Sequence, residues 1–151
     1  MSKEENIKNE LVNKFAYLGG NINVPRPRRI FLEATQENFK EVFVYIAKQL
    51  KFSHLCTITG LDEGEKLSFI YHMADDSGIL LNFKISVLKE NPVLKTVTDC
   101  FPGAEIYERE LVDLLGAKVE GLPEGNRYPL TDDWPLDQFP LRKDWKGANN
   151  A

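Results

Sequence analysis

The stretch LSFIYHMADDSGILLNFKISV, Leu67 to Val87, decides the fold of this chain. Large apolar residues alternate with mostly smaller or polar ones before and after the connection Asp75-Asp76-Ser77-Gly78. A period of two is typical of strands with one buried face, and the acidic, glycine-ending connection is typical of a turn. The stretch therefore predicts a β-hairpin, and the flanking segments must supply the layer that covers its apolar face.

A helix is predicted on the amino-terminal side of the hairpin. Thr35 is positioned to cap it, and its apolar positions have helical spacing. These positions are Phe39, Val42, Phe43, Ile46 and Leu50. A strand from His54 to Thr59 follows, and the turn around Gly60 to Gly64 ends it. This helix and this strand come just before the hairpin in the sequence.

The first 34 residues predict one more helix and one more strand. Ile7, Leu11, Phe15 and Leu18 recur at the spacing of a helix face between residues 4 and 18, and Gly19-Gly20 supplies the stop. Residues 21–29 contain Pro25 and Pro27 and are interpreted as an extended linker, followed by a short strand over residues 29–34.

Beyond the hairpin the pattern is less regular up to Gly103. Pro92 and Pro102 bracket a segment that is expected to form a short helix. Residues 104–115 then predict a helix that buries Tyr107, Leu111 and Leu114 and ends at Gly116. The fold class that follows is α+β. We expect a two-layer sandwich of a mainly antiparallel sheet with helices on one face.

The last segment, residues 117–151, differs from the rest and is predicted to be an extended irregular arm. Four prolines interrupt it, yet it carries Tyr128, Phe139 and both tryptophans of the chain, Trp134 and Trp145. Exposed aromatic side chains are unfavourable, so something must cover this arm. It either folds back on its own domain, residues 1–116, or lies along a partner, and the residues alone leave both alternatives open.

Composition excludes several classes of function. The chain has 151 residues and a net charge of −4 with both signs interspersed, which argues against a nucleic-acid partner. No apolar run approaches the ~20 residues that cross a bilayer, and the polar amino terminus is unlike a secretory signal. We therefore expect a protein that stays in the cytoplasm. Cys56 and Cys100 are too few for an iron–sulfur cluster held by four thiolates.

Few residues suggest catalysis. His54 and Cys56 share one side of a predicted strand, but lack a second ligand pair, and His72 lies in the hairpin. Asp75 and Asp76 fit turn chemistry better than acid catalysis. On the last helix, Arg109 and Asp113 are four residues apart and are expected to pair on a charged outer face. The sequence predicts no catalytic, cofactor-binding or metal-binding residue on this chain.

One string of residues is recognisable. FPGAEIYERELVDLLG, Phe101 to Gly116, resembles the signature of the 30-kDa subunit of respiratory complex I, also known as its C subunit, and of its relatives in energy-converting membrane-bound hydrogenases. Further matches follow downstream at Gly121-Leu122-Pro123, Arg127, Asp133-Trp134-Pro135 and Pro140-Leu141-Arg142-Lys143-Asp144-Trp145, and lie upstream at Arg28-Arg29-Ile30-Phe31, residues 55–60, Ile70-Tyr71-His72 and Asn91-Pro92. The resemblance covers nearly the whole chain.

The resemblance implies a subunit of a multisubunit oxidoreductase complex with no active site and no cofactor of its own. Nickel–iron and iron–sulfur centres are then expected on partners, namely a large catalytic subunit and an iron–sulfur small subunit. The structural signature is Glu108, Arg109, Glu110, Asp113 and Gly116. The expected partner interface is Arg127, Trp134, Pro140, Leu141, Arg142, Lys143, Asp144 and Trp145. The chain would sit peripherally on the cytoplasmic side of the membrane.

Two differences between this chain and the family pattern bear on which kind of complex would contain it. Many complex I members have His where this chain has Leu122, and the long extensions of some relatives are missing. Both features favour an ion-pumping hydrogenase complex, with a complex I type or a ferredoxin- or formate-linked complex as the alternative. A free-standing enzyme with a pocket near His54, Cys56 or His72, and an interaction module unrelated to redox chemistry, are the other hypotheses.

Overall fold

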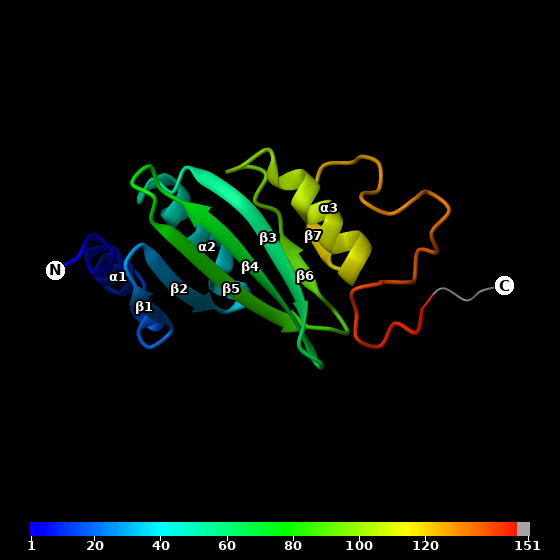
Figure 1. The fold of residues 1–151 in the computed structure, drawn as a ribbon, viewed down its shortest axis with the longest axis horizontal. Coiled ribbons are helices and arrows are strands. Elements are labelled where there is room, and N and C mark those ends of the chain that lie inside the picture. The colour runs from blue at the N-terminus through cyan, green and yellow to red at the C-terminus, as the bar shows by residue number, and fades with distance from the viewer. Residues whose placement is uncertain (148–151) are drawn as a thin grey trace. The chain divides into compact units, whose positions relative to one another are not determined.

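A five-stranded sheet with the strand order β1-β2-β5-β4-β3 organises the computed structural model, which describes residues 1–147 (Figure 1). Its strands are β1 Ile22–Arg26, β2 Arg29–Ala34, β3 His54–Asp62, β4 Lys66–Ala74 and β5 Leu80–Leu88. β1 and β2 pair antiparallel, whereas β2 and β5 pair parallel with Leu32 opposite Phe83. Short turns join β3 to β4 and β4 to β5, which makes these neighbours antiparallel as well. The predicted α+β class with a mainly antiparallel sheet is confirmed.

The chain divides into two compact units. Unit 1 consists of Met1–Thr59 and Phe69–Ser86, and unit 2 consists of Gly60–Ser68 and the chain from Val87 onward. The residues on both sides of position 116 belong to unit 2, and the division expected there stays a prediction. Residues 148–151 of the expected arm lie outside the described residues.

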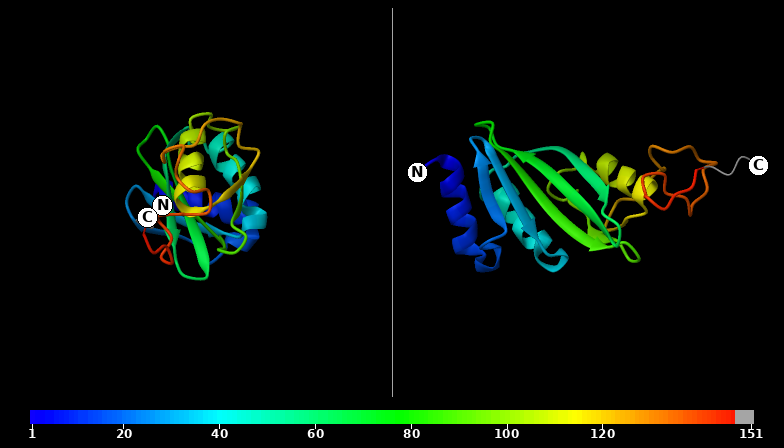
Figure 2. Two further views of the ribbon diagram at one scale, coloured as in Figure 1. Left: turned by 90° about the vertical axis from the view of Figure 1, so that its right-hand side faces the viewer. Right: turned by 60° about the horizontal axis from the view of Figure 1, so that its bottom comes forward.

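Helix α2, Gln36–Lys48, lies against one face of the sheet in unit 1 (Figure 2). Aromatic side chains fill this contact. The Phe39 ring lies 4.8 Å from the Tyr71 ring and 5.2 Å from the Phe83 ring, measured between centroids. Aromatic pairs at this separation add stability beyond their buried area. Every odd-numbered residue from Leu67 to Met73 and from Leu81 to Val87 is buried, which confirms the predicted hairpin. Thr35 precedes α2 as predicted, but its side chain forms no cap, and Leu50 lies beyond the end of the helix.

Two predictions for the amino-terminal segment need correction. The expected helix over residues 4–18 is α1, Lys3–Lys14, followed by a 3-10 turn over Ala16–Leu18. The helix ends at Phe15, whose backbone is not helical, and the buried Phe15 ring meets the Tyr45 ring edge-on at 5.4 Å between centroids. The expected linker over residues 21–29 contains β1, because proline is tolerated on an edge strand with an irregular register.

Unit 2 contains helix α3, Ala104–Leu115, and a small parallel sheet of β6, Val93–Lys95, and β7, Lys118–Glu120. The prediction of a short helix between Pro92 and Pro102 was wrong, because this segment contains β6. Leu94 pairs with Val119 across this sheet and is buried, so the long-range strand partner outweighs local helix signals. Gly116 ends α3 as predicted, with a φ of 75°.

Gly60 was predicted to begin a turn, but it lies inside β3, which extends to Asp62. The residue allows α3 to approach the strand closely. A Cβ atom added to Gly60 would lie 2.9 Å from Leu111 Cδ2 and closer still to Leu115 Cδ1. Both leucines are buried, so the glycine here serves packing rather than chain reversal.

Gly60→Ala should therefore lower the free energy of unfolding by about 1–3 kcal/mol, because it overpacks this contact. Gly103→Ala is the matched control, since a Cβ there meets no atom within 4 Å. The control should stay within about 0.5 kcal/mol of wild type. Urea unfolding measures both. Equal unfolding midpoints for the two variants would show that α3 does not rest on Gly60.

Candidate functional site

The predicted signature residues of α3 and the predicted interface residues of the arm lie in the same compact unit. α3 points two of its carboxylates inward and its carboxyl end toward the arm, which we call the tail and define as residues 117–147. The contacts between α3 and the tail make up the candidate functional site.

Glu108 is fully buried, although the helix was expected to carry its charges outward. Its Oε1 accepts a hydrogen bond from Val97 N at 2.7 Å, and its Oε2 accepts one from Thr96 Oγ1 at 2.7 Å. A buried carboxylate is tolerated only when such donors replace water. Tyr107 and Leu114, predicted to be buried, are only half-buried. α3 is therefore rotated relative to the predicted face, because the apolar positions alone do not reveal buried carboxylates.

Arg109 does not pair with Asp113, so this prediction was wrong. Its Nε and Nη2 donate to Glu105 Oε1 at 3.1 and 2.7 Å, and Nη2 also donates to the Pro123 carbonyl. The guanidinium thus fixes the start of the tail on α3. Glu110, the remaining charged signature residue, is half-buried and has no hydrogen-bond or ion-pair partner among residues 1–147.

Asp113 is nearly buried and orders the middle of the tail. Its Oδ1 accepts from Arg127 Nε at 3.2 Å, and its Oδ2 accepts from Leu130 N at 3.1 Å. Arg127 in turn donates from Nη1 to the Trp134 carbonyl at 2.6 Å. A carboxylate with both a guanidinium and a backbone donor forms strong, charge-assisted hydrogen bonds. Asp113 therefore holds residues 127 and 130 directly, and Arg127 extends the network to residue 134.

The carboxyl end of α3 is capped largely by the tail. Gly116 N donates to Val112 O at 3.0 Å within the helix end itself. Leu141 N donates to Leu114 O at 3.0 Å, and Arg142 Nε donates to Leu115 O at 2.6 Å. The last carbonyls of a helix lack partners of their own, so the tail completes α3. Gly116 cannot carry a side chain here, because a Cβ would lie 2.8 Å from the Arg142 guanidinium.

The last part of the tail is held by Asp62 at the end of β3. Asp62 Oδ2 accepts from Lys89 Nζ and from Lys143 N, each at 2.7 Å, and Oδ1 accepts from Gly64 N at 2.9 Å. Burial alone would raise the pKa of Asp62. The hydrogen bonds from Lys89, Gly64 and Lys143 outweigh it and lower the pKa to about 2. Asp62 is thus a fixed anion under physiological conditions, and Lys89 also lies 3.4 Å from Asp144.

The tail aromatics, which were predicted to anchor a partner, contact one another. The Trp134 and Trp145 rings lie 5.9 Å apart, and both indole N–H groups donate to Gln138. The Arg142 guanidinium lies 4.8 Å above the Phe139 ring. These side chains are half-buried within the tail, whereas Leu136 and Leu141 are 81% and 54% exposed. The large apolar side chains of the tail that face solvent therefore include the leucines Leu136 and Leu141 as well as the aromatic Tyr128.

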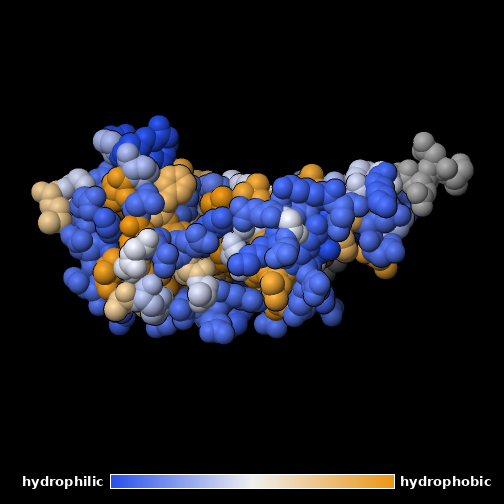
Figure 3. All heavy atoms as spheres, turned by 90° about the horizontal axis from the view of Figure 1, so that it is seen from below, coloured by the Kyte–Doolittle hydropathy of each residue, from blue (hydrophilic) through white to orange (hydrophobic). Residues whose placement is uncertain are grey.

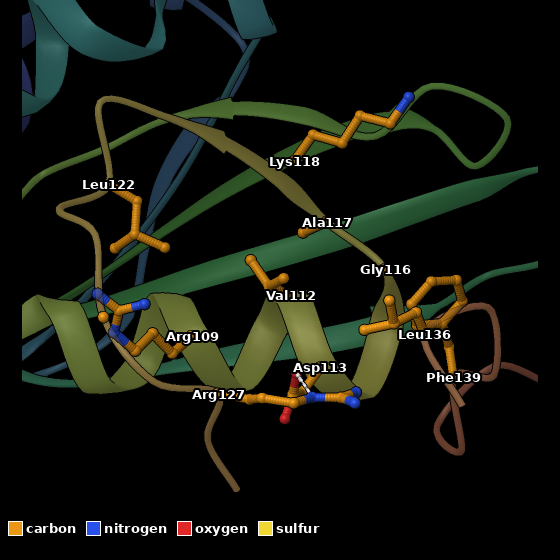
Figure 4. A pocket seen from close by; sticks show the side chains of 11 residues that line it. Arg109, Val112, Asp113, Gly116, Ala117, Lys118, Leu122, Arg127, Leu136 and Phe139 are labelled. Carbon is orange, nitrogen blue, oxygen red and sulfur yellow. Dashed lines mark hydrogen bonds and ion pairs between the residues drawn. The ribbon is translucent and has the colours of Figure 1, made fainter. Parts of the chain in front are cut away.

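A cavity of about 410 Å³ lies between α3 and the tail (Figure 4). Its walls comprise part of α3, the connection to β7, and three stretches of the tail. They are formed by Arg109, Val112, Asp113, Gly116, Ala117, Lys118, Leu122, Gly125, Arg127, Leu136 and Phe139. The walls thus include Arg109, Asp113 and Gly116 of the predicted signature and Arg127 of the predicted interface, whereas Pro140, Lys143 and Asp144 lie outside them.

The residues considered for catalysis do not assemble into one site. His72 bridges two side chains on the sheet of unit 1: its Nε2 lies 2.8 Å from Thr59 Oγ1 and its Nδ1 2.6 Å from Asn82 Oδ1. Asp75 closes the hairpin turn by accepting from Ser77 N and Ile79 N. Within residues 1–147, no group of three or more metal-ligating side chains is found. No helix in this part of the chain has the length and hydropathy to cross a membrane.

Asp62 and Lys89 are the functional residues that sequence reasoning missed. Asp62 was assigned to a turn because Gly60 and Gly64 flank it, and Lys89 stood in an irregular segment. One signal was available in the sequence. If the strand is continued through Gly60, it ends at Asp62, which places this carboxylate at the end of the strand. Thr96 was missed as well, because nothing in its neighbourhood indicated that a carboxylate 12 residues later would be buried against it.

Comparison with known proteins gives consistent results. Residues 25–151 match the family described as "Respiratory-chain NADH dehydrogenase, 30 Kd subunit". The C subunit of the F(420)H(2) dehydrogenase of Methanosarcina mazei is 32% identical over 93% of this chain and 90% of the relative. Membrane-bound hydrogenase subunit beta of Pyrococcus furiosus is 31% identical over 98% of this chain and 89% of the relative.

Two further similarities add detail. The C/D subunit of the NADH-quinone oxidoreductase of Phocaeicola vulgatus is 33% identical over 79% of this chain, which corresponds to 23% of that longer protein. Among solved structures, a chain of the membrane-bound sulfane sulfur reductase, described as an archaeal respiratory membrane complex, superposes with a TM-score of 0.84. That match has 26% identity and covers 95% of this chain and 86% of the other.

The two neighbouring glutamates of α3 should differ sharply when they are replaced. Glu108→Ala removes a buried acceptor and leaves Val97 N without its partner, which should cost about 1–3 kcal/mol of unfolding free energy. Glu110→Ala, the control on the same helix, should change it by less than about 0.5 kcal/mol. Urea titration of both variants measures the difference, and a Glu108→Ala protein as stable as the control would contradict the buried hydrogen bonds.

Proposed function

The chain belongs to the family of the respiratory-chain NADH dehydrogenase 30 Kd subunit, and from this premise we propose that it is a non-catalytic assembly subunit of an ion-pumping, energy-converting membrane-bound hydrogenase complex. Its relatives are subunits of complex I-like respiratory complexes, and the chain is a subunit of such a complex. The hydrogenase assignment is supported by the subunit beta relative, which aligns over nearly the full length of both proteins.

A second candidate is the equivalent subunit of a complex that oxidises F(420)H(2) or NADH instead of producing hydrogen. The F(420)H(2) dehydrogenase relative favours it, because its identity and coverage equal those of the hydrogenase relative within a few per cent. The Leu122 argument from the sequence supports ranking the hydrogenase first. The chemistry of the purified complex decides between the two.

The observation that carries the assembly role is the contrast between the two sides of the tail. On one side, polar groups of the tail donate hydrogen bonds within the unit: Leu130 N to Asp113, Lys143 N to Asp62, and Arg142 Nε to the Leu115 carbonyl at the end of α3. On the other side, the apolar side chains Tyr128, Leu136 and Leu141 of the tail are 46%, 81% and 54% exposed. Figure 3 shows a face on which hydrophilic residues predominate and hydrophobic ones form small separate groups. A segment that is already ordered and exposes large apolar side chains offers a partner anchors that it can bury.

The large catalytic subunit is the proposed partner of this surface. The C/D relative carries the matching region and additional sequence in one chain, which supports adjacency of the C and D subunits in such complexes. The iron–sulfur small subunit is the second proposed neighbour. Nickel–iron and iron–sulfur centres are then carried by these partners, and the chain associates with the cytoplasmic side of the membrane only through them.

Replacing exposed apolar residues of the tail should weaken assembly without unfolding the chain. The variant Tyr128→Ser/Leu141→Ser, affinity-tagged and produced in the organism that makes the complex, should recover at least about tenfold less large subunit than wild type, as expected when interface anchors are removed. Leu88→Ser is the control, because Leu88 is 63% exposed in the same unit but outside the tail.

Three results are informative. Unchanged urea midpoints for all three proteins, with loss of the large subunit only in the tail variant, support the assembly role. Full recovery of the large subunit by the tail variant contradicts it. Nickel and hydrogen evolution in the wild-type complex support the hydrogenase assignment, whereas oxidation of F(420)H(2) or NADH without nickel supports the alternative.

A further inference from the structure

The cavity between α3 and the tail combines apolar walls with unused cationic donors. Val112 of α3, Ala117 after it, and Leu122 and Phe139 of the tail supply the apolar part. At about 410 Å³ it lies within the size range of sites that receive a side chain or small ligand. None of the predictions from the sequence concerned a cavity at this place.

The charge of the lining is positive even though the chain as a whole is negative. Arg109, Lys118 and Arg127 line the cavity together with one carboxylate, Asp113. Asp113 pairs with Arg127, and Glu105, outside the lining, pairs with Arg109. The Lys118 ammonium points away from the cavity (Figure 4) and donates to Asn91 Oδ1, so the two guanidinium groups carry the argument. Arg109 uses Nε and Nη2, and Arg127 uses Nε and Nη1, for contacts within residues 1–147. Each guanidinium thus retains one Nη group without a partner in this part of the chain. Such donors favour a carboxylate, which guanidinium groups bind in a planar, directional way.

Leu136 marks the rim of the cavity. It lines the cavity while remaining 81% exposed, more than any other apolar residue of the described tail. The residues on either side of it in the chain are held, since Trp134 bonds to Arg127 and Gln138, and the Arg142 guanidinium lies over the Phe139 ring. An exposed leucine between two held segments, beside a cavity, is suited to cover an inserted apolar side chain.

We infer that this cavity is the docking site for an acidic segment of the large catalytic subunit, which inserts an apolar side chain against Val112, Leu122 and Leu136 and places a carboxylate beside Arg109 or Arg127. The inference deepens the proposed function and rests on it. A small inorganic anion fits less well, because Figure 4 shows the guanidinium groups of Arg109 and Arg127 apart along α3, with Val112 between them. Complementary charge and a central apolar contact are the features that give protein interfaces their specificity.

Val112→Glu tests the inference directly, since it supplies a carboxylate between the two guanidinium groups and fills the cavity. The chain should stay folded, because its new charge meets unused donors, but recovery of the large subunit should fall by at least about tenfold. Ile106→Glu is the matched control. It introduces the same residue on the same helix at a position that is 55% exposed and outside the cavity walls.

Photo-crosslinking identifies the occupant. The variant Leu136→p-benzoyl-phenylalanine in the assembled complex should link to a segment of the large subunit that contains Asp or Glu. A link to another subunit, or to a segment without an acidic residue, would overturn the inference. So would equal recovery of the large subunit by Val112→Glu and Ile106→Glu.

Failure of the proposed function gives a different result. In that case the wild-type chain itself does not recover the large subunit, and both Glu variants behave like it. If wild type recovers the large subunit and Val112→Glu does so equally well, the assembly role stands and only the docking site is wrong.

Discussion

The carboxyl end of α3 is the constraint on which the site depends. A helix leaves its last carbonyl groups without partners, and burying them unsatisfied is costly. In this chain Leu141 N and Arg142 Nε meet the carbonyls of Leu114 and Leu115. The tail is therefore placed by backbone groups of the helix that it completes, and two carboxylates, Asp113 and Asp62, fix it at further points. The two carbonyl groups at the end of α3 gain partners from the tail in this way.

This arrangement explains how an irregular, proline-rich segment can be an interaction surface. A disordered arm would lose conformational entropy when it binds, which weakens association. A tail already held by α3 loses less, so its exposed side chains contribute more of their apolar area to affinity. Leu130 N, Lys143 N and the Arg142 guanidinium are used within the unit, whereas Leu136 and Leu141 remain largely exposed. Under the proposed function, the contacts that hold the tail on α3 also order the surface that a partner would cover, and the cavity lies between the same two segments.

Much of the fold could be predicted from the sequence, but the details of the site could not. The hairpin, α2 and the end of α3 at Gly116 follow from local periodicity and turn chemistry, and the structure confirms them. β1 was missed because its prolines are tolerated on an edge strand, and β6 was missed because a distant partner, β7, forms it against local signals. The prediction of the buried face of α3 was wrong because Glu108 is buried. Its carboxylate accepts hydrogen bonds from residues 96 and 97, and the spacing of apolar residues cannot reveal such partners. Likewise, Asp113 pairs with a residue 14 positions later instead of its helical neighbour Arg109.

Hydrogen exchange on the isolated chain tests the central claim that the tail is ordered before any partner binds. The amides to follow are Leu130, Leu141 and Lys143, which donate to Asp113, Leu114 and Asp62. We expect each to exchange at least about tenfold more slowly than in the urea-unfolded chain, because a hydrogen-bonded amide exchanges only when its local structure opens. Exchange of all three at the unfolded rate would contradict the account. It would mean that the partner, and not α3, orders the tail.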